Sequence, residues 1–167
     1  MITIQLRRGK AESIKRFHPW IFSGAIQGTQ PHNQHIEEGE IVRVVDHEGA
    51  FIALGHYQIG SIAVRILSFE EVNIDENFWT SRLRQAFRMR TALGYTNRGK
   101  EHSIYRLVHG EGDQLPGLII DVFGETAVMQ AHSVGMHVCR EIIADALIEA
   151  TEGQVRNVYY KSETTLP

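Results

Sequence analysis

Apolar and polar side chains alternate in short runs through residues 1–70, a period typical of strands that bury one face. This pattern predicts strands over residues 2–6, 41–45, 50–57 and 61–69. The Asp-His-Glu-Gly run at 46–49 predicts a turn between the second and third strands, and Gly60 a break before the last. One short helix is expected over residues 11–16. Several short strands with a single helix favour a small, partly closed β-barrel.

From residue 76 the apolar period changes to that of a helix. Residues 70–75 are polar, and we interpret them as the junction between two domains, 1–70 and 71–167. A helix is expected over residues 76–93, capped by Asn73 or Asp75, with Glu76 completing a capping box after Asn73. Arg84 and Arg88 should face solvent or a partner. The opposite, buried stripe comprises Trp79, Leu83, Ala86, Phe87 and Leu93.

The remaining pattern predicts a hairpin, a helix and a last strand. Strands over 118–122 and 126–132 are joined tightly at 123–125. A helix capped by Ser133 should then run to residue 150, followed by a strand over 155–160. This order indicates a small α/β domain behind the barrel, and the whole chain is α+β. The helix's expected buried stripe comprises Val138, Cys139, Ile142, Ile143, Ala146 and Leu147.

Composition places the chain among ordinary globular proteins. Its 167 residues are 43% hydrophobic and 22% charged, and no apolar run approaches the ~18 residues of a membrane span. A single cysteine cannot form an internal disulfide, so we expect a reducing, cytoplasmic setting and no membrane partner.

The net charge of −3 conceals two basic segments, and positive charge that is local in this way is what phosphate binding requires. Residues 1–20 carry five basic side chains against one acid, and residues 82–100 carry six and no acid. Trp20 could stack on bases exposed in looped RNA, or it could be barrel core together with Phe22. Solvated charge is the alternative for the cations. The candidate RNA-binding residues are Arg7, Arg8, Lys10, Lys15, Arg16 and His18, with Arg84 and Arg88 on the later helix.

Residues 106–121 form a bent, polar segment that ends in an apolar run. Glu111 and Asp113 could hold a metal or act as an acid–base pair with His109. The structural interpretation is favoured: both carboxylates accept backbone hydrogen bonds, and Arg106 pairs with one of them. No metal or catalytic residue is therefore assigned, and Cys139 is expected to be core rather than a nucleophile. The expected structural-loop residues are Arg106, Gly110, Glu111, Asp113, Gly117 and Asp121.

Two strings in this chain resemble one family. Residues 106–121 read Arg-Leu-Val-His-Gly-Glu-Gly-Asp-Gln-Leu-Pro-Gly-Leu-Ile-Ile-Asp, and residues 8–24 contain Lys-Arg-Phe-His-Pro-Trp-Ile-Phe-Ser-Gly. Both resemble, in the same order, strings of the PUA-domain-containing, S-adenosylmethionine-dependent methyltransferases that modify cytosine C5 of large-subunit ribosomal RNA. The resemblance implies a PUA-like barrel whose first helix and neighbouring strand edge face RNA, followed by the family's central domain.

The resemblance also sets the functional expectation. In that family a Rossmann domain binds S-adenosylmethionine and follows the central domain, whereas this sequence contains no glycine-rich cofactor turn. We therefore expect a fragment that binds and positions structured RNA, with no cofactor of its own and a catalytic domain as its missing C-terminal partner. Two alternatives stay open: a stand-alone RNA-binding adaptor, and a small hydrolase built on Glu111, Asp113 and Asp121.

Overall fold

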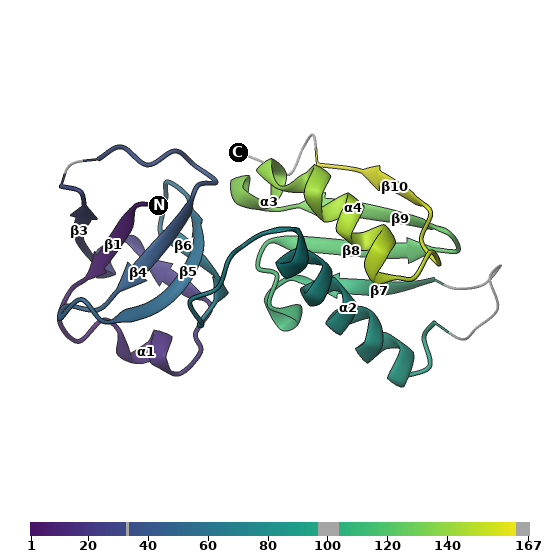
Figure 1. The fold of residues 1–167 in the computed structure, drawn as a ribbon, viewed down its shortest axis with the longest axis horizontal. Coiled ribbons are helices and arrows are strands. Elements are labelled where there is room, and N and C mark those ends of the chain that lie inside the picture. Colours follow the sequence, from purple (N-terminus) through teal and green to yellow (C-terminus); the bar gives the residue numbers. More distant parts are fainter. Residues whose placement is uncertain (33, 97–103, 163–167) are drawn as a thin grey trace. The chain divides into compact units, whose positions relative to one another are not determined.

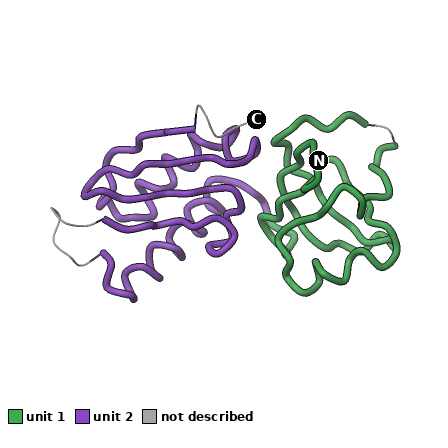
Figure 2. Tube along the Cα trace, turned by 180° about the vertical axis from the view of Figure 1, so that it is seen from behind, with its two compact units in different colours: residues 1–72 green, residues 73–167 purple. Residues whose placement is uncertain are grey.

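The computed structural model describes residues 1–32, 34–96 and 104–162 of the chain. The chain divides into two compact units, Met1–Val72 and Asn73–Pro167, which are coloured separately in Figure 2. Each unit has its own sheet, and the fold is α+β.

The first unit is a curled, six-stranded sheet in the order β2-β6-β5-β4-β1-β3 (Figure 1). Neighbouring strands are antiparallel except β1 and β4, which are parallel. Register irregularities in all four antiparallel pairings bend the sheet toward a half-barrel. The elements are β1 (Thr3–Leu6), α1 (Glu12–Lys15), β2 (Trp20–Phe22), the 3-10 turn η1 (Ser23–Ala25), β3 (Ile26–Gln30), β4 (Ile41–Val45), β5 (Phe51–Tyr57) and β6 (Ile62–Ser68).

The alternating pattern correctly predicted β1, β4, β5, β6 and the short helix α1. Their inward side chains form the core of the unit, in which Ile4, Leu6, Val42, Val44 and Val64 are fully buried. Strands β2 and β3 were not predicted. β2 has three residues and β3 contains a central glycine, so neither shows enough alternation to be read.

The turn predicted at 46–49 is held by Asp46. Its Oδ1 accepts the N–H groups of Glu48 and Ala50, both at 3.0 Å, and its Oδ2 accepts from Lys15 Nζ at 3.3 Å. Burial raises the pKa of Asp46, but these hydrogen bonds outweigh it, so that the pKa lies below its usual value. The turn between β4 and β5 is therefore also an attachment point for α1.

The second unit is a four-stranded sheet, β10-β9-β8-β7, with its main helices α2 and α4 side by side over one face (Figure 1). Strands β7, β8 and β9 are antiparallel neighbours, and β10 is parallel to β9. Alternate residues of β8, Leu118, Ile120 and Val122, are buried beneath the helices. The elements are α2 (Glu76–Ala92), β7 (Ile104–His109), the 3-10 turn η2 (Gly110–Asp113), β8 (Leu118–Phe123), β9 (Thr126–Ala131), α3 (Val134–Val138), α4 (Arg140–Ala150) and β10 (Asn157–Tyr160).

Helix α2 begins and buries its apolar face largely as predicted. Asp75 is the cap, accepting the Phe78 N–H at 3.0 Å. Leu93 was placed wrongly in the buried stripe. It is the C-cap, past the last helical turn, and its side chain is 64% exposed. The stripe members that are buried are Trp79, Leu83, Ala86 and Phe87.

The single helix predicted over 133–150 is wrong, because two helices meet at Cys139. Ser133 does cap the first, accepting from Met136 N at 3.4 Å. The backbone at Cys139 (φ −86°, ψ 7°) leaves the helical range, which shifts the face that the following residues present. Val138 is consequently exposed and Cys139 only half-buried, whereas Ile143, Ala146 and Leu147 are buried as expected.

Acid should destabilise the first unit through His56 in β5. Its side chain is 2% exposed, and burial, aided by the positive charge of Arg65, lowers its pKa to about 4. Below about pH 6.5 this histidine is protonated in the unfolded chain, whereas in the folded chain it becomes protonated only near pH 4. The unfolding free energy therefore falls as the pH falls from 6.5 to 4. We expect a loss of about 2 kcal/mol in unfolding free energy between pH 7 and pH 5. Urea unfolding at both pH values measures it.

The matched variants are His56→Gln and, at a more exposed position of the same unit, His47→Gln. The loss between pH 7 and pH 5 should largely disappear in the first and persist in the second. An equal loss in wild type and His56→Gln would contradict the assignment to His56.

Candidate functional site

The basic segment, residues 7–16, runs from the end of β1 through α1 and is exposed along most of its length. Arg7 Nε donates to the carbonyl of Ile26 at 3.0 Å, which fixes the start of the segment against β3. Arg8, Lys10 and Arg16 are exposed. Lys15 forms an ion pair with Asp46, with Nζ 3.3 Å from Oδ2, and the Asp46 side chain is 6% exposed. The predicted cations thus differ in how available they are to a ligand.

The aromatic side chains that follow α1 lie at the surface. Phe22 is 49% exposed, which contradicts the alternative that placed it in the barrel core, and Trp20 is half-buried. β2 lies at the edge of its sheet and only Ile21, between them, points fully inward. His18 lies near both aromatics, with ring centroids 6.0 Å from Trp20 and 6.1 Å from Phe22.

A cavity open to solvent, which we call the α1 hollow, lies between α1 and β2 and has a volume of about 350 Å³. Its lining joins the basic segment to the aromatics, and η1 closes the remaining side. The lining residues that matter here are Lys10, Ser13, Ile14, Trp20, Ile21 and Phe22. Ile14 and Ile21 are buried and form an apolar floor, while Lys10 and Ser13 supply polar groups. Such a surface suits a flat apolar group that carries a negative charge.

Phe17 is a residue that the sequence patterns did not single out. It has φ 65°, a left-handed conformation that is rare for a bulky side chain, and it is 71% exposed. Its ring packs edge-on against Phe69 at 5.1 Å. The conformation ends α1 after a single turn, because Phe17 N–H donates to Ile14 O at 2.8 Å and His18 N–H to Ser13 O at 3.1 Å. The strained residue thereby directs the chain into β2.

The two arginines predicted on α2 are in different environments. Arg88 is exposed. Arg84 is half-buried, and its Nη2 donates to Glu149 of α4 at 3.2 Å, so it contacts the neighbouring helix. A role for either in binding a ligand stays a prediction.

The polar segment at 106–121 is strand β7, the turn η2 and strand β8, and its ion pairs differ from those predicted. Arg106 does not pair with Glu111 or Asp113; it binds Asp121 across the β7–β8 ladder, with Nε–Oδ1 at 2.8 Å and Nη2–Oδ2 at 3.0 Å. The two residues are register partners, so their side chains leave the same face of the sheet. The hydrogen bond to Asp121 raises the pKa of Arg106 further, which keeps the guanidinium charged.

Asp113 is instead bound by Arg90 of α2, which the sequence analysis missed as a structural residue. Nη1 and Nη2 of Arg90 lie 2.5 and 2.8 Å from the two carboxylate oxygens. Arg90 Nε also donates to the carbonyl of Arg106 at 3.0 Å. Asp113 Oδ2 accepts the backbone N–H of His109 at 2.6 Å, which confirms that this carboxylate fixes the turn. The Arg90 side chain is 12% exposed and that of Asp113 is 3% exposed.

Gly110 and Gly117 confirm the expectation of positive φ in this loop, with values of 52° and 82°. At Gly117 a Cβ atom would lie 2.7 Å from Ser133 Oγ. That hydroxyl caps α3, so the loop packs directly against the start of a helix. The loop therefore contacts the start of α3 where it joins η2 to β8; its rigidity stays a prediction.

The described residues offer little for metal or thiol chemistry. They contain no group of three or more His, Cys, Asp or Glu side chains arranged to hold a metal ion. Burial raises the pKa of Cys139, which disfavours the nucleophilic thiolate. Two of the three carboxylates of the hydrolase alternative, Asp113 and Asp121, bind different arginines. They therefore do not form a common catalytic pair.

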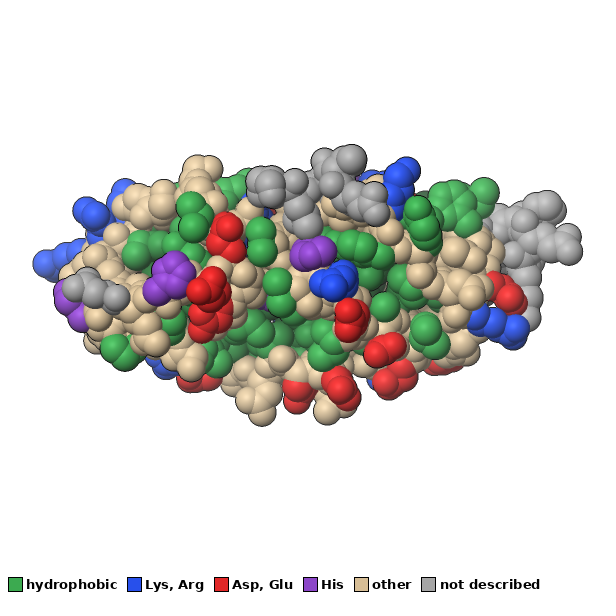
Figure 3. All heavy atoms as spheres, turned by 90° about the horizontal axis from the view of Figure 1, so that it is seen from above, with side chains coloured by type: hydrophobic (Ala, Val, Ile, Leu, Met, Phe, Trp, Pro, Cys, Tyr) green, Lys and Arg blue, Asp and Glu red, His purple; other side chains and the backbone are tan. Residues whose placement is uncertain are grey.

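On the face seen in Figure 3, acidic and basic side chains lie among hydrophobic ones. Within the described parts, no helix combines the length and apolar character that a membrane span requires. The α1–β2 region, where exposed cations adjoin a hollow, is therefore the candidate site.

Comparisons with known proteins show what this chain is similar to. Residues 4–69 match the family described as PUA-like domain. Ribosomal RNA large subunit methyltransferase I of Citrobacter koseri is 37% identical over 148 residues, which cover 87% of this chain and 36% of the relative. The Salmonella paratyphi B protein of the same description is 38% identical over 85% of this chain and 34% of its own length. The chain spans about one third of the length of these relatives.

A structural comparison agrees on the fold. A candidate S-adenosylmethionine-dependent methyltransferase from Streptococcus mutans matches with a TM-score of 0.78 at 16% identity, over 97% of this chain and 41% of that chain. The resemblance to PUA-containing ribosomal RNA methyltransferases that the two sequence strings indicated is confirmed.

Proposed function

Residues 4–69 are a PUA-like domain, and from this premise we propose that the first unit binds structured RNA, ribosomal RNA in particular, through the basic segment and the α1 hollow. One observation carries the proposal: exposed Arg8, Lys10 and Arg16 lie on the same short stretch of chain that forms one wall of an aromatic-lined hollow. Cations neutralise phosphates and displace counterions, whereas aromatic faces bind bases.

The finer proposal concerns the reaction that this binding serves. The chain would hold RNA for an S-adenosylmethionine-dependent transfer of a methyl group to C5 of a cytosine in large-subunit ribosomal RNA. Support comes from the relatives, which are described as ribosomal RNA large subunit methyltransferases, and for the cytosine C5 atom from the sequence resemblance alone. Cofactor binding and chemistry would belong to a catalytic domain outside the described residues.

Reversing two exposed charges of the basic segment should weaken RNA binding. We expect Arg8→Glu with Arg16→Glu to lower affinity for large-subunit ribosomal RNA fragments at least ten-fold at low salt. The slope of log affinity against log salt should also become shallower by about 1.5, since two phosphate contacts are lost. Lys15 is unsuitable for this test because its change would also break the contact with Asp46. Binding isotherms at two or more salt concentrations supply both numbers.

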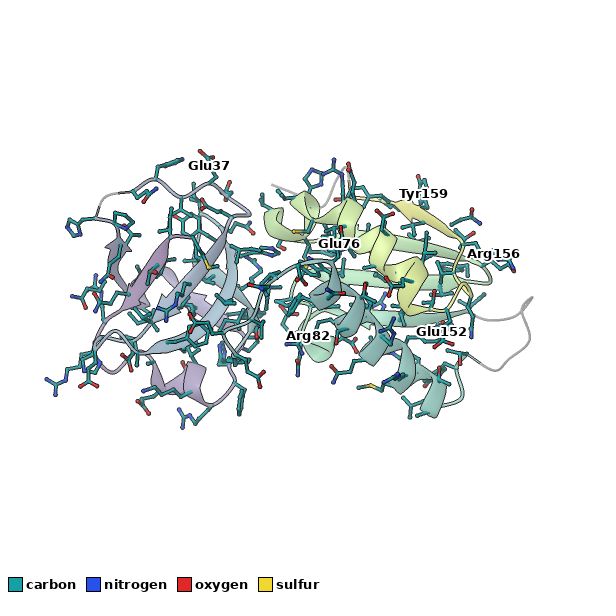
Figure 4. The ribbon with its side chains drawn as sticks, in the orientation of Figure 1. Glu37, Glu76, Arg82, Glu152, Arg156 and Tyr159 are labelled. Atoms are coloured by element: carbon teal, nitrogen blue, oxygen red, sulfur yellow. The ribbon has the colours of Figure 1, made fainter. Side chains whose placement is uncertain are left out.

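The matched control reverses two charges in the second unit, Arg156→Glu with Lys161→Glu. Both residues are exposed, and Figure 4 places Arg156 beside β10. The ion pair of Arg156 with Glu125 is longer than that of Lys15, at 3.8 Å, and its carboxylate is 39% exposed, so its loss should cost little. This variant has the same net charge as the first, so a general charge effect would weaken both equally. Equal affinity of the two variants would contradict a role for the basic segment. Arg88→Glu tests separately whether α2 contributes.

A further inference from the structure

The sheet of the second unit exposes the face opposite its two main helices. Helices α2 and α4 lie in front of the strands in Figure 1, and Figure 2 gives the view from behind. In β8 the residues beneath the helices are buried, whereas Ile119 and Asp121 are half-buried and Phe123 is 48% exposed. We call the side of the sheet that carries these last three residues the open face.

Two exposed aromatic side chains lie on the open face. Phe123 of β8 pairs with Thr126 of β9, and Tyr159 of β10, which is 61% exposed, pairs with Val128 of β9. Thr126 and Val128 are two residues apart on one strand, so all four side chains leave the same side of the sheet. Two strand spacings and two residues separate the aromatics, which corresponds to about 12 Å. They are too far apart to hold one base between them, so each would stack on a base of its own.

An ion pair occupies the same face beside Phe123. Arg106 of β7 donates to Asp121 from Nε and Nη2, and its Nη1 lies 3.3 Å from Nδ1 of His109. The Arg106 side chain is 46% exposed. A guanidinium has five N–H groups, and these contacts with described residues engage three of them. Arg106 is therefore held in place and can still donate to a ligand.

The charge of the open face is compatible with a phosphate backbone. Within the bounds of the four strands, its acidic residue is Asp121, which Arg106 neutralises. The exposed acids of α4, Glu141, Asp145 and Glu149, belong to a helix that covers the opposite face. The acidic side chains of this half of the chain therefore do not oppose an anionic ligand on the open face.

An unpaired RNA strand suits this surface better than a protein does. The centre of a protein interface is depleted of charge, and covering Arg106 and Asp121 with apolar side chains would remove both from water. Nucleotides instead offer a flat ring to each aromatic side chain and polar edges to the guanidinium. A four-stranded sheet with exposed aromatic residues is one of the surfaces on which proteins stack the bases of single-stranded RNA. Bases within a duplex are already stacked and cannot reach it.

We infer that the open face binds two unpaired nucleotides of an RNA strand, one stacked on Phe123 and one on Tyr159, with Arg106 donating to the nucleotide on Phe123. This site lies in the second unit and is separate from the α1 hollow. It goes beyond the proposed function, which concerns the first unit, and shares with it only the class of ligand.

The test measures binding of an oligouridylate, which forms no paired structure, and of a blunt-ended RNA duplex with the same number of phosphates. The full chain carries Arg8→Glu with Arg16→Glu throughout, so that binding by the first unit is weakened. In this parent, Phe123→Leu and Tyr159→Leu should each weaken oligouridylate binding roughly 5- to 150-fold, the range for loss of one stacked base. The two factors should multiply in the double variant, because the side chains are about 12 Å apart. Duplex binding should be unchanged.

Conservative variants separate stacking from apolar contact. Leucine preserves much of the apolar surface but has no ring, whereas Phe123→Tyr and Tyr159→Phe keep the ring and should bind oligouridylate as the parent does. Ile148→Ala is the control on the other side of the sheet, because Ile148 lies on α4 and is 40% exposed. It should bind both probes as the parent does.

The outcomes distinguish this inference from the proposed function. If the parent does not bind oligouridylate, or the leucine variants bind it equally well, the nucleotide site is overturned and binding by the first unit is unaffected. If reversing Arg8 and Arg16 changes no RNA affinity while the leucine variants lose oligouridylate, the proposed function fails and the inference stands. Sedimentation without RNA tests a second copy as the occupant. A dimer that Phe123→Ala dissociates, with oligouridylate binding unchanged, would overturn the inference in favour of an interface between copies.

Discussion

Arg90→Ala is expected to lower the unfolding free energy of the second unit by about 3–5 kcal/mol, the range for removing one partner of a buried ion pair. The Asp113 side chain is 3% exposed and would lose the guanidinium that contacts both of its oxygens. The same change also removes the hydrogen bond from Arg90 to the Arg106 carbonyl. The variant thus disconnects α2 from β7 and from η2 at once. Denaturant unfolding followed by the emission of buried Trp79 reports on this unit when Trp20 of the first unit is replaced by phenylalanine in wild type and variant alike.

Arg84→Ala provides the control on the same helix. Arg84 also pairs with a carboxylate, but its partner Glu149 is 66% exposed, and surface pairs of this kind contribute about 0–1 kcal/mol. Adding Asp113→Asn to Arg90→Ala should recover part of the loss, since a neutral amide is less costly to bury than an uncompensated charge. A loss for Arg90→Ala no greater than for Arg84→Ala would show that the buried pair does not hold the loop.

Gly117→Val should cost about 3 kcal/mol, from two sources. The φ of 82° is a conformation in which a β-branched residue is strained, at about 1–3 kcal/mol. The new Cβ would also lie 2.7 Å from Oγ and 3.0 Å from Cβ of Ser133, so the cap of α3 must move, at about 0.5–2 kcal/mol. Thermal melting of the variant against wild type measures the combined effect.

Gly112→Val is the matched change within the same loop. Gly112 is exposed, and a Cβ there would meet nothing within 4 Å and would not fall on a positive φ. We expect a loss below about 1 kcal/mol, typical of surface substitutions. If Gly117→Val and Gly112→Val have the same melting temperature, the loop is not held rigidly. The functional interpretations of its carboxylates must then be reconsidered.

The hydrophobic pattern of a segment was sufficient to predict its structure where the segment buries one face against the core of its own unit. The alternation of β1 and of β4 to β6, and the stripe of α2 as far as Phe87, were predictable because each buries one face against a core. Segments whose state depends on distant partners were not. β2 is a strand only because β6 pairs with it, and Phe22 is exposed because its sheet ends there.

Ion pairs show the same limit. The sequence correctly indicated that Asp113 fixes the turn, but Arg106 was chosen as the cation because it is near in sequence. Strand alternation sends Arg106 to the face of the sheet where Asp121 lies, and Arg90 reaches Asp113 from a helix 23 residues earlier. The α1 hollow likewise combines residues from α1 and β2, and only its cations and aromatics, not its concavity, were visible in the sequence.

The parallel pairing of β10 with β9 determines the order in which the second sheet can assemble. β7, β8 and β9 are successive antiparallel neighbours, and β8 and β9 join through a short turn that closes with little loss of chain entropy. β10 must pair with β9 in the register Asn157 with Thr126, and the chain between them has to cross over through α3 and α4 first. Non-local parallel pairing forms slowly because the chain loses the entropy of closing this long loop before any strand contact forms. We therefore expect β10 to be the last strand to join, after the β7–β9 meander has formed.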